Sequence, residues 1–172
     1  NPNAPTGIYE SLDHVEEIIK NNPDVIVIVD EAYIDFGGET ALPLIDKYDN
    51  LVVVRTFSKS RSMAGLRIGY AISNPELIKA LNDVKYSYNS YTMNRPSLVL
   101  GVESIHDDAY FREKVGQIIA TRERFVKEIA ELGFTCLPSS ANFVFATHES
   151  IPAKEIFAAA KENNIYVRYF DK

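Results

Sequence analysis

Residues 51–69 read LVVVRTFSKSRSMAGLRIG, and the rest of the chain is organised around them. Their first four residues are apolar and mostly β-branched, which predicts a buried strand, and a second strand is expected to open near Arg67. A polar loop that holds Thr56, Ser58 and Lys59 connects the two strands. In open α/β sheets ligands bind at the strand ends, so we expect these hydroxyls, this amine and this guanidinium to converge on one anionic ligand such as a phosphate.

The composition is that of an ordinary globular protein. With 172 residues and 46% hydrophobic content, the chain can bury a substantial core. Its formal net charge of −6 at pH 7 argues against a nucleic-acid surface, and no basic cluster offsets that average. No apolar run approaches the roughly 20 residues of a membrane span, and no charged leader with an apolar core opens the sequence. We therefore expect a cytoplasmic protein.

Cysteine and histidine usage points to no redox or metal chemistry. The single cysteine, Cys136, lies among apolar neighbours, which favours a buried structural thiol over a reactive one. The three histidines, His14, His106 and His148, have neither close spacing nor carboxylate partners. The sequence therefore predicts no internal disulfide and no metal site.

The first part of the chain alternates helix-like and strand-like segments, which favours an α/β fold with a mostly parallel sheet. Apolar strands of this kind belong to sheets that are covered on both faces. The expected elements are a helix capped by Ser11, a strand over 25–29 that runs into Asp30, a short helical piece over 42–48, and strands over 51–55 and 66–72. The last two strands are close enough in sequence to pair antiparallel.

The second part is helical and then changes character after Gly133. The expected elements are helices from Pro75 and over 96–105, separated by a loop over 86–94, a long helix over 109–132, strands over 134–137, 142–146 and 165–169, and a helix over 152–163. Helices as long as the one over 109–132 often cross between domains. We therefore expect residues 1–105 to form part of a large domain, and residues 106–172 an interdomain helix with part of a small α+β domain.

Three motifs, in the right order, resemble those of the fold-type I aminotransferases that use pyridoxal 5′-phosphate. They are NPNAPTG (residues 1–7), DEAYIDF (30–36) and TFSK (56–59) followed eight residues later by Arg67. Within that family the chain is most similar to the histidinol-phosphate aminotransferases, through RTFSK with AGLRIGYAI, YNSYTMNR (88–95) and SSANFVF (139–145). The resemblance covers nearly the whole chain, although members of the family are about twice as long. It implies that residues 1–105 belong to the cofactor-binding large domain.

Lys59 is the first candidate for catalysis. The resemblance implies that it forms the Schiff base with pyridoxal phosphate and then carries a proton between the substrate carbon and the cofactor. A lysine is usually a solvated surface group, but Lys59 follows a buried strand among hydroxyls. Partial desolvation and a nearby cation such as Arg67 would favour the neutral amine that this chemistry needs.

Asp30 and Tyr33 are the next candidates for the cofactor site. A buried carboxylate at Asp30 would pair with the pyridine nitrogen and keep it protonated, so that the ring can accept carbanion electrons. The alternative is a cap or turn residue. The resemblance implies that Tyr33 hydrogen-bonds the phenolic oxygen of the cofactor, whereas a core tyrosine is the alternative. Asp30 and Lys59 end neighbouring strands, which predicts positions on opposite sides of one ring, and Glu31 is expected to point outward or form a salt bridge.

Thr56, Ser58 and Arg67 form the candidate phosphate clamp, because Arg67 offers two parallel donors to a dianion and the hydroxyls add neutral donors. Arg55, Arg61 and Lys85 are alternatives that match no position of the family motif. Pattern alone makes Arg168, in YVRYF, a surface arginine at the end of a strand. The resemblance implies that Arg168 faces the substrate phosphate.

One position departs from the family pattern. Ala4 stands where an asparagine usually contacts the ring oxygen of the cofactor, and alanine cannot donate that hydrogen bond. Either Asn3 substitutes from the adjacent position or Tyr33 makes the contact alone. Loss of one neutral hydrogen bond costs about 1 kcal/mol and should not abolish cofactor binding.

The resemblance implies transamination between histidinol phosphate and 2-oxoglutarate in histidine biosynthesis, giving imidazole acetol phosphate and glutamate. An aromatic-amino-acid aminotransferase and a threonine-phosphate decarboxylase of the same fold are alternatives. A cofactor-binding regulatory module without turnover is an alternative of another class. The resemblance implies small-molecule substrates, an amino donor and a 2-oxo acid, as partners. The family builds its active site across a homodimer interface with residues from both subunits. We therefore expect a homodimer, and we expect residues 1–172 to be inactive when they are expressed alone.

Overall fold

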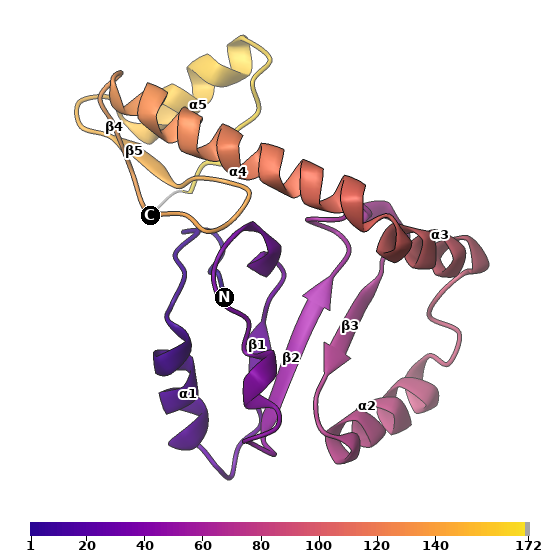
Figure 1. The fold of residues 1–172 in the computed structure, drawn as a ribbon. Helices are drawn as coiled ribbons and strands as arrows, with labels where there is room; N and C mark the ends of the chain where they lie inside the picture. Colours follow the sequence, from indigo (N-terminus) through magenta and orange to yellow (C-terminus); the bar gives the residue numbers. More distant parts are fainter. Residues whose placement is uncertain (171–172) are drawn as a thin grey trace.

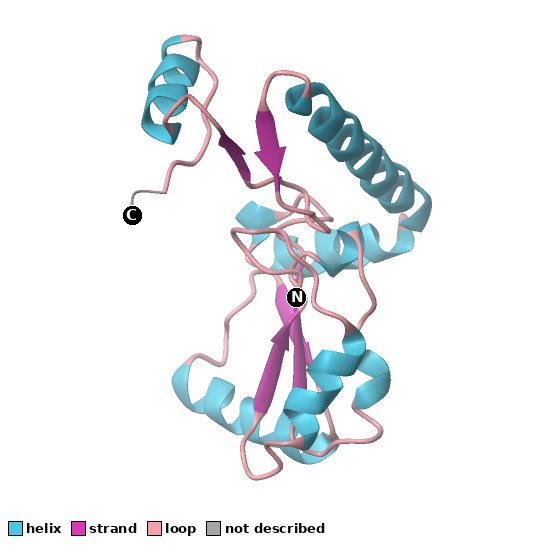
Figure 2. Cartoon of the chain, turned by 90° about the vertical axis from the view of Figure 1, so that its left-hand side faces the viewer, coloured by secondary structure: helices cyan, strands magenta, loops and turns pink. Residues whose placement is uncertain are grey.

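The computed structural model describes residues 1–170 and contains a three-stranded sheet and a two-stranded sheet. Figure 1 shows the long helix α4 running across one end of the three-stranded sheet and on toward the smaller sheet. Figure 2 shows the two sheets at opposite ends of the molecule, with loops between them. The α/β class expected from the sequence is confirmed.

The first part of the chain forms the larger sheet and its helical connections. Its elements are helix α1 (Leu12–Lys20), strands β1 (Val27–Asp30), β2 (Leu51–Thr56) and β3 (Gly69–Ile72), and the 3-10 helices η1 (Ile34–Phe36), η2 (Leu42–Leu44) and η3 (Ala64–Leu66). Helix α1 begins where the sequence predicts, because the Ser11 hydroxyl accepts a hydrogen bond from the His14 backbone N–H.

The order of the sheet is β1-β2-β3, with β1 parallel and β3 antiparallel to β2. Asp30 pairs in register with Val54, and Thr56 pairs with Gly69. The carboxyl ends of β1 and β2 therefore lie side by side. The chain leaves β2 at that edge, forms the loop that carries Lys59, and returns through β3.

The core lies between α1, η2 and one face of this sheet. Val15 and Ile19 of α1 pack against Val29, Leu51 and Val53 of the strands. Full burial of an aliphatic side chain of this size stabilises a fold by about 1.5–3 kcal/mol. These contacts hold the sheet edge on which the strand-end residues stand.

The opposite face of β1 differs from the expectation of a sheet covered on both sides. Ile28 is 64% exposed, whereas Leu51, Val52 and Val53 in the middle strand are all buried. Within residues 1–170, β1 is an edge strand, and its Ile28 face is not packed against another described element. The prediction is therefore confirmed for β2 and wrong for β1.

The second part of the chain is mostly helical. Its elements are helices α2 (Pro75–Tyr88), α3 (Arg95–His106) and α4 (Asp108–Ala130), strands β4 (Phe134–Cys136) and β5 (Ala146–His148), and helix α5 (Ala153–Glu162). Side chains of Asn74, Asn94 and Asp107 cap the three long helices. In the part of the chain that the structure describes, no helix combines the length and the apolar character needed to cross a membrane.

Several element boundaries differ from those expected. Strand β3 begins at Gly69 rather than residue 66, because 64–66 form a 3-10 turn and Arg67 takes a left-handed conformation with φ +56°. Helix α2 continues through Tyr88 into the predicted loop. The strand predicted over 142–146 is instead β5 at Ala146–His148.

The strand predicted over 165–169 is absent from the described structure. The Ile165 N–H donates to the Ala160 carbonyl and closes the end of α5, and beyond it the segment makes ring contacts rather than a ladder. Most of its side chains are exposed, and no partner strand lies beside it among residues 1–170.

Residues 139–141 dock onto the N-terminal loop. The Ser140 N–H donates to the Gly7 carbonyl at 2.8 Å, and Ala141 is fully buried. Gly7 has φ +79°, and a Cβ at this position would lie 2.5 Å from Ser139 Oγ. This close approach requires glycine.

We expect Gly7→Ala to destabilise the fold by about 1–2 kcal/mol or more, because alanine is strained at this φ and collides with Ser139. Gly116→Ala is the matched control, since Gly116 lies in α4 with open space around it and should gain about 0.5–1 kcal/mol. The measurement is the free energy of unfolding in urea. Equal midpoints for wild type and Gly7→Ala would contradict the requirement for glycine.

Candidate active site

The structure brings Lys59 and Tyr33 together at the carboxyl ends of β1 and β2. The Lys59 Nζ lies 5.3 Å from the centroid of the Tyr33 ring, within the range of a cation–π contact. Both side chains are half-buried. Asp30, the last residue of β1, ends the strand that pairs with the one before the lysine loop. A half-buried amine therefore lies beside a phenol ring, and a carboxylate ends the neighbouring strand.

The backbone of the lysine loop is held in part by the Thr56 hydroxyl. Thr56 Oγ1 accepts from the Ser58 N–H at 3.1 Å and donates to the Ile68 carbonyl at 3.2 Å. The Phe57 N–H donates to the same carbonyl at 3.1 Å. These bonds fix the turn that presents Lys59.

Two side chains that follow the lysine anchor the loop to other elements. The Arg61 guanidinium lies 4.2 Å from the Phe111 ring centroid and also donates to the Ser104 carbonyl. The buried Ser60 hydroxyl donates to an Asp35 carboxylate oxygen. Arg61 is therefore an anchor and not a member of a phosphate clamp, a role that the sequence pattern did not reveal.

Asp30 is exposed, whereas a buried carboxylate was expected. Its Oδ1 accepts from the Ala32 N–H at 2.9 Å, as in a turn residue. Side chains alternate along a strand, so Asp30 lies on the Ile28 face, which the described elements leave open. The carboxylate is accessible to a ligand at the strand end.

Glu31 forms a salt bridge, which was one of the two expected outcomes, but it is buried with only 2% exposed. Its carboxylate accepts from Arg55 Nε at 2.9 Å and Nη2 at 2.8 Å. Burial disfavours the charged guanidinium, but the contacts with Glu31 outweigh this and raise the pKa of Arg55 above its usual value. Arg55 is thus committed to Glu31 and is not a free anion ligand.

The three clamp candidates lie at the same end of the β2–β3 hairpin. Arg67 is exposed, and its Nη1 donates to the Ala64 carbonyl at 2.9 Å. Thr56 and Ser58 make the loop contacts described above. The Thr56 hydroxyl and the Arg67 guanidinium thus donate to backbone carbonyls, whereas Ser58 takes part through its backbone N–H. Four further N–H donors of the guanidinium fork are not needed for the Ala64 contact.

A wall of the site comes from residues 139–143, far away in sequence. The Phe143 ring meets the Tyr33 ring edge-on, with centroids 5.1 Å apart and an interplanar angle of 90°. Arg122 of α4 holds this segment in place, donating to the carbonyls of Phe36 at 3.1 Å and Ala141 at 2.7 Å. Sequence reasoning missed both residues as parts of the site, although Phe143 lies in the SSANFVF motif.

The two substitutes considered for the missing asparagine differ in position. The Asn3 side-chain amide donates to Thr6 Oγ1 at 2.7 Å, within its own exposed loop. Tyr33 is the one that lies beside Lys59. The geometry favours Tyr33 for the contact that Ala4 cannot make.

Arg168 is exposed, and among residues 1–170 it forms no hydrogen bond or ion pair with the strand-end residues. Its segment packs through Phe170 onto Phe145, with ring centroids 5.8 Å apart. Phe145 lies two residues after Phe143, which contacts Tyr33. Residues 143–145 therefore contact both the segment that carries Arg168, through Phe145, and the lysine site, through Phe143.

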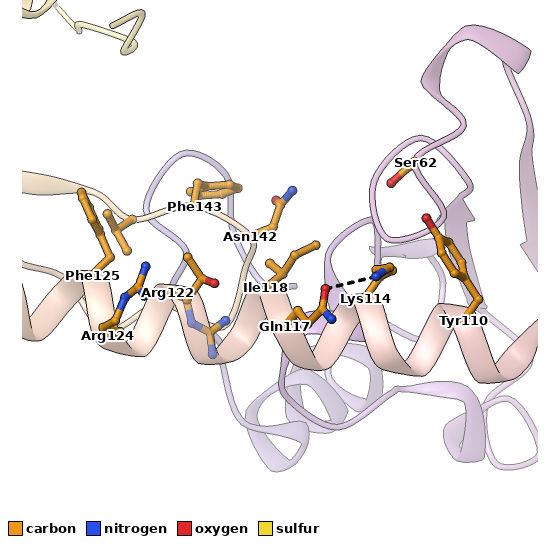
Figure 3. Close-up of a pocket in the computed structure, with 12 residues that line it drawn as sticks. Ser62, Tyr110, Lys114, Gln117, Ile118, Arg122, Arg124, Phe125, Asn142 and Phe143 are labelled. Atoms are coloured by element: carbon orange, nitrogen blue, oxygen red, sulfur yellow. Dashed lines mark hydrogen bonds between the residues drawn. The ribbon is translucent and has the colours of Figure 1, made fainter.

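A cavity of about 620 Å³ lies along α4 and includes none of the predicted site residues. Figure 3 shows Ser62 and Tyr110 at one end of it and Phe125 and Phe143 toward the other. Lys114 Nζ donates to Gln117 Oε1 at 3.3 Å across this surface. Phe143 both lines this cavity and contacts Tyr33 of the lysine site.

Comparison with known proteins agrees with this geometry. Residues 1–171 match the family described as aminotransferase class I and II. The chain therefore belongs to this family. Two similar curated relatives are the histidinol-phosphate aminotransferases of Clostridium botulinum (strain 657 / Type Ba4), 52% identical over all 172 residues, and of Brachyspira hyodysenteriae, 54% identical over 171.

The chain covers 49% and 48% of these two relatives, so it spans about half their length. Among solved structures, the histidinol-phosphate aminotransferase of Clostridium acetobutylicum matches 98% of this chain with a TM-score of 0.89 and 27% identity, and the chain covers 52% of it. That of Sinorhizobium meliloti, in complex with pyridoxal-5′-phosphate, matches 98% with a TM-score of 0.86 and 28% identity, and the chain covers 47% of it. The fold is that of the fold-type I aminotransferases, and the family implies pyridoxal phosphate.

We expect Arg122→Met to loosen the wall of the site, because the buried Ala141 carbonyl loses its donor at a cost of about 1–3 kcal/mol. Amide hydrogen exchange over 139–143 should become faster, while exchange in β2 stays unchanged. Arg124→Met is the control, since its ion pair with Glu128 is exposed and its loss should stay within about 0.5 kcal/mol. Unchanged exchange over 139–143 in Arg122→Met would show that Arg122 does not hold the wall.

Proposed function

We propose that this chain carries the catalytic lysine of an aminotransferase that uses pyridoxal phosphate and transfers the amino group of histidinol phosphate to 2-oxoglutarate. The observation that carries the proposal is Lys59, a half-buried amine 5.3 Å from the Tyr33 ring at the ends of two parallel strands. Two relatives that are 52% and 54% identical to this chain are named histidinol-phosphate aminotransferases, which supports histidinol phosphate as the amino donor.

The groups at the strand ends fit pyridoxal phosphate. Lys59 would hold it covalently through Nζ, and the accessible Asp30 carboxylate would pair with its ring nitrogen. Tyr33 would donate to its phenolic oxygen. When bound, the cofactor supplies an electron sink that stabilises the carbanion formed at the substrate carbon next to the amine.

The phosphate end of the cofactor would be bound by Thr56, Ser58 and Arg67. Arg67 brings the positive charge, and its exposed fork has donors beyond the one given to the Ala64 carbonyl. The Thr56 hydroxyl proton is engaged with a backbone carbonyl, so its part in binding requires that this hydrogen bond be exchanged for one to phosphate.

Lys59 would act as the acid–base group of the site. Its Nζ would take up and hold the proton that leaves the substrate carbon next to the amine. The Tyr33 and Phe143 rings lie on one side of the amine and would exclude water from it. The anchors of the lysine loop keep the amine at the strand end during these transfers.

We further propose that residues 1–105 belong to the cofactor-binding domain, and residues 106–172 to an interdomain helix and part of a small α+β domain. The separation of the two sheets supports this division. We also propose a cytoplasmic homodimer. Exposed apolar side chains on α2 and α3 support a further interface, because such patches usually mark contacts.

We expect Lys59→Ala to abolish transamination by the complete polypeptide that carries these residues. Borohydride reduction after incubation with pyridoxal phosphate, followed by peptide mapping, should place the label on Lys59 in the wild type and on no residue of that loop in the variant. Lys47→Ala, which alters an exposed lysine, is the control and should keep both label and activity. Activity retained without Lys59 would rule out the proposed mechanism.

Arg168→Ala should distinguish the proposed substrate from its rivals. If Arg168 binds the substrate phosphate, its loss removes a charge-assisted contact and raises KM for histidinol phosphate by about 10–100-fold. Phenylalanine, which lacks a phosphate, should be turned over as before and serves as the internal control. A wild-type enzyme that prefers phenylalanine, or releases CO₂ from threonine phosphate, would exclude histidinol phosphate as the natural donor.

A further inference from the structure

We propose that the buried Glu31–Arg55 ion pair positions the cofactor site by locking the ends of β1 and β2 from the face opposite to Asp30 and Thr56. The inference rests on the proposed function of Lys59. It assigns positioning roles to two residues that touch neither the lysine nor the other strand-end groups.

The contacts around Glu31 satisfy both oxygens of its carboxylate. Oε2 accepts from Arg55 Nε and Nη2 and from Thr40 Oγ1, at 2.8 to 2.9 Å. Oε1 accepts from Thr40 Oγ1 at 2.9 Å and from the Ala41 N–H at 2.6 Å. The Glu31 N–H also donates to the Val54 carbonyl at 2.8 Å. The carboxylate therefore ties the end of β1 to two other segments, which are β2 through Arg55 and residues 40–41.

The alternation of side chains places this pair behind the site. Asp30 pairs with Val54 in the parallel ladder, and their neighbours Glu31 and Arg55 project to the other face. Arg55 continues the buried row of Leu51 and Val53, on the side of the core. Asp30 and Thr56 share the open face. The ion pair thus holds the strand ends while leaving the ligand side free.

Stability alone does not explain charges in this place. The desolvation of a buried ion pair can exceed its Coulombic gain, so apolar or neutral residues would often serve the core as well. Two N–H groups of Arg55 converge on one Glu31 oxygen, and these charge-assisted hydrogen bonds offer direction that apolar packing lacks. The directed hydrogen bonds between Glu31 and Arg55 would fix the position of Asp30 relative to the lysine loop.

The predicted consequence is that loss of the pair weakens cofactor binding out of proportion to stability. Small displacements of site residues are costly, and removal of a group that orients a ligand typically changes affinity or activity about 10–100-fold. For Glu31→Gln in the complete polypeptide, we expect the Kd of pyridoxal phosphate to rise at least about tenfold. The variant also removes the negative partner of the partly buried Arg55 guanidinium, so the melting temperature should fall.

The double variant Glu31→Gln with Arg55→Gln separates positioning from stability. It removes both charges, and the new amide oxygen at position 31 can still accept from the Ala41 N–H. We expect the melting temperature to recover toward wild type, while the Kd of pyridoxal phosphate and the pH midpoint of the bound cofactor's absorbance stay altered. Glu128→Gln, which breaks an exposed ion pair with Arg124, is the control and should change none of these.

The outcomes are distinct. If the double variant recovers wild-type cofactor affinity and the wild-type pH midpoint together with its stability, the pair is structural only and the inference is overturned. It is also overturned if Glu31→Gln binds pyridoxal phosphate as the wild type does. If the wild-type polypeptide fails to take up borohydride label at Lys59, the proposed function itself fails, and this inference fails with it.

Discussion

Parallel pairing of β1 with β2 is the constraint on which the structure depends. Because Asp30 pairs with Val54, β1 and β2 end at the same edge of the sheet, and the residues that follow each strand lie at that edge. Packing of α1 against Val29, Leu51 and Val53 holds that edge in place. A slip of one residue would turn Asp30 toward the core and Glu31 toward the ligand face, because side chains alternate along a strand.

The site is completed by parts of the chain that lie far apart. Arg122 bonds the carbonyls of Phe36 and Ala141, and Phe143 closes one side of Tyr33. This links the smaller sheet to the loops at the ends of the larger one. A movement of the smaller sheet relative to the larger one would therefore change the environment of Lys59 through the contacts of Arg122 and Phe143.

The motifs allowed much of this to be predicted. The Ser11 cap, the buried strand before Lys59 and the order of the elements follow from local rules of capping and periodicity. The strand expected over 165–169 was wrong, since alternation alone cannot provide a partner strand. Burial of Asp30 was also wrong for the described residues, because burial depends on which elements cover a face and not on the residue itself.

By itself the sequence determined the family, the α/β class and the residue types at the strand ends, because these depend on short motifs and local periodicity. Tertiary structure alone decided which of several arginines is free. Arg55 is held by Glu31 and Arg61 lies on Phe111, whereas Arg67 remains exposed. The physical reason is that a guanidinium is claimed by whichever carboxylate, carbonyl or ring the fold brings to it, and those partners lie at sequence separations that no local pattern encodes.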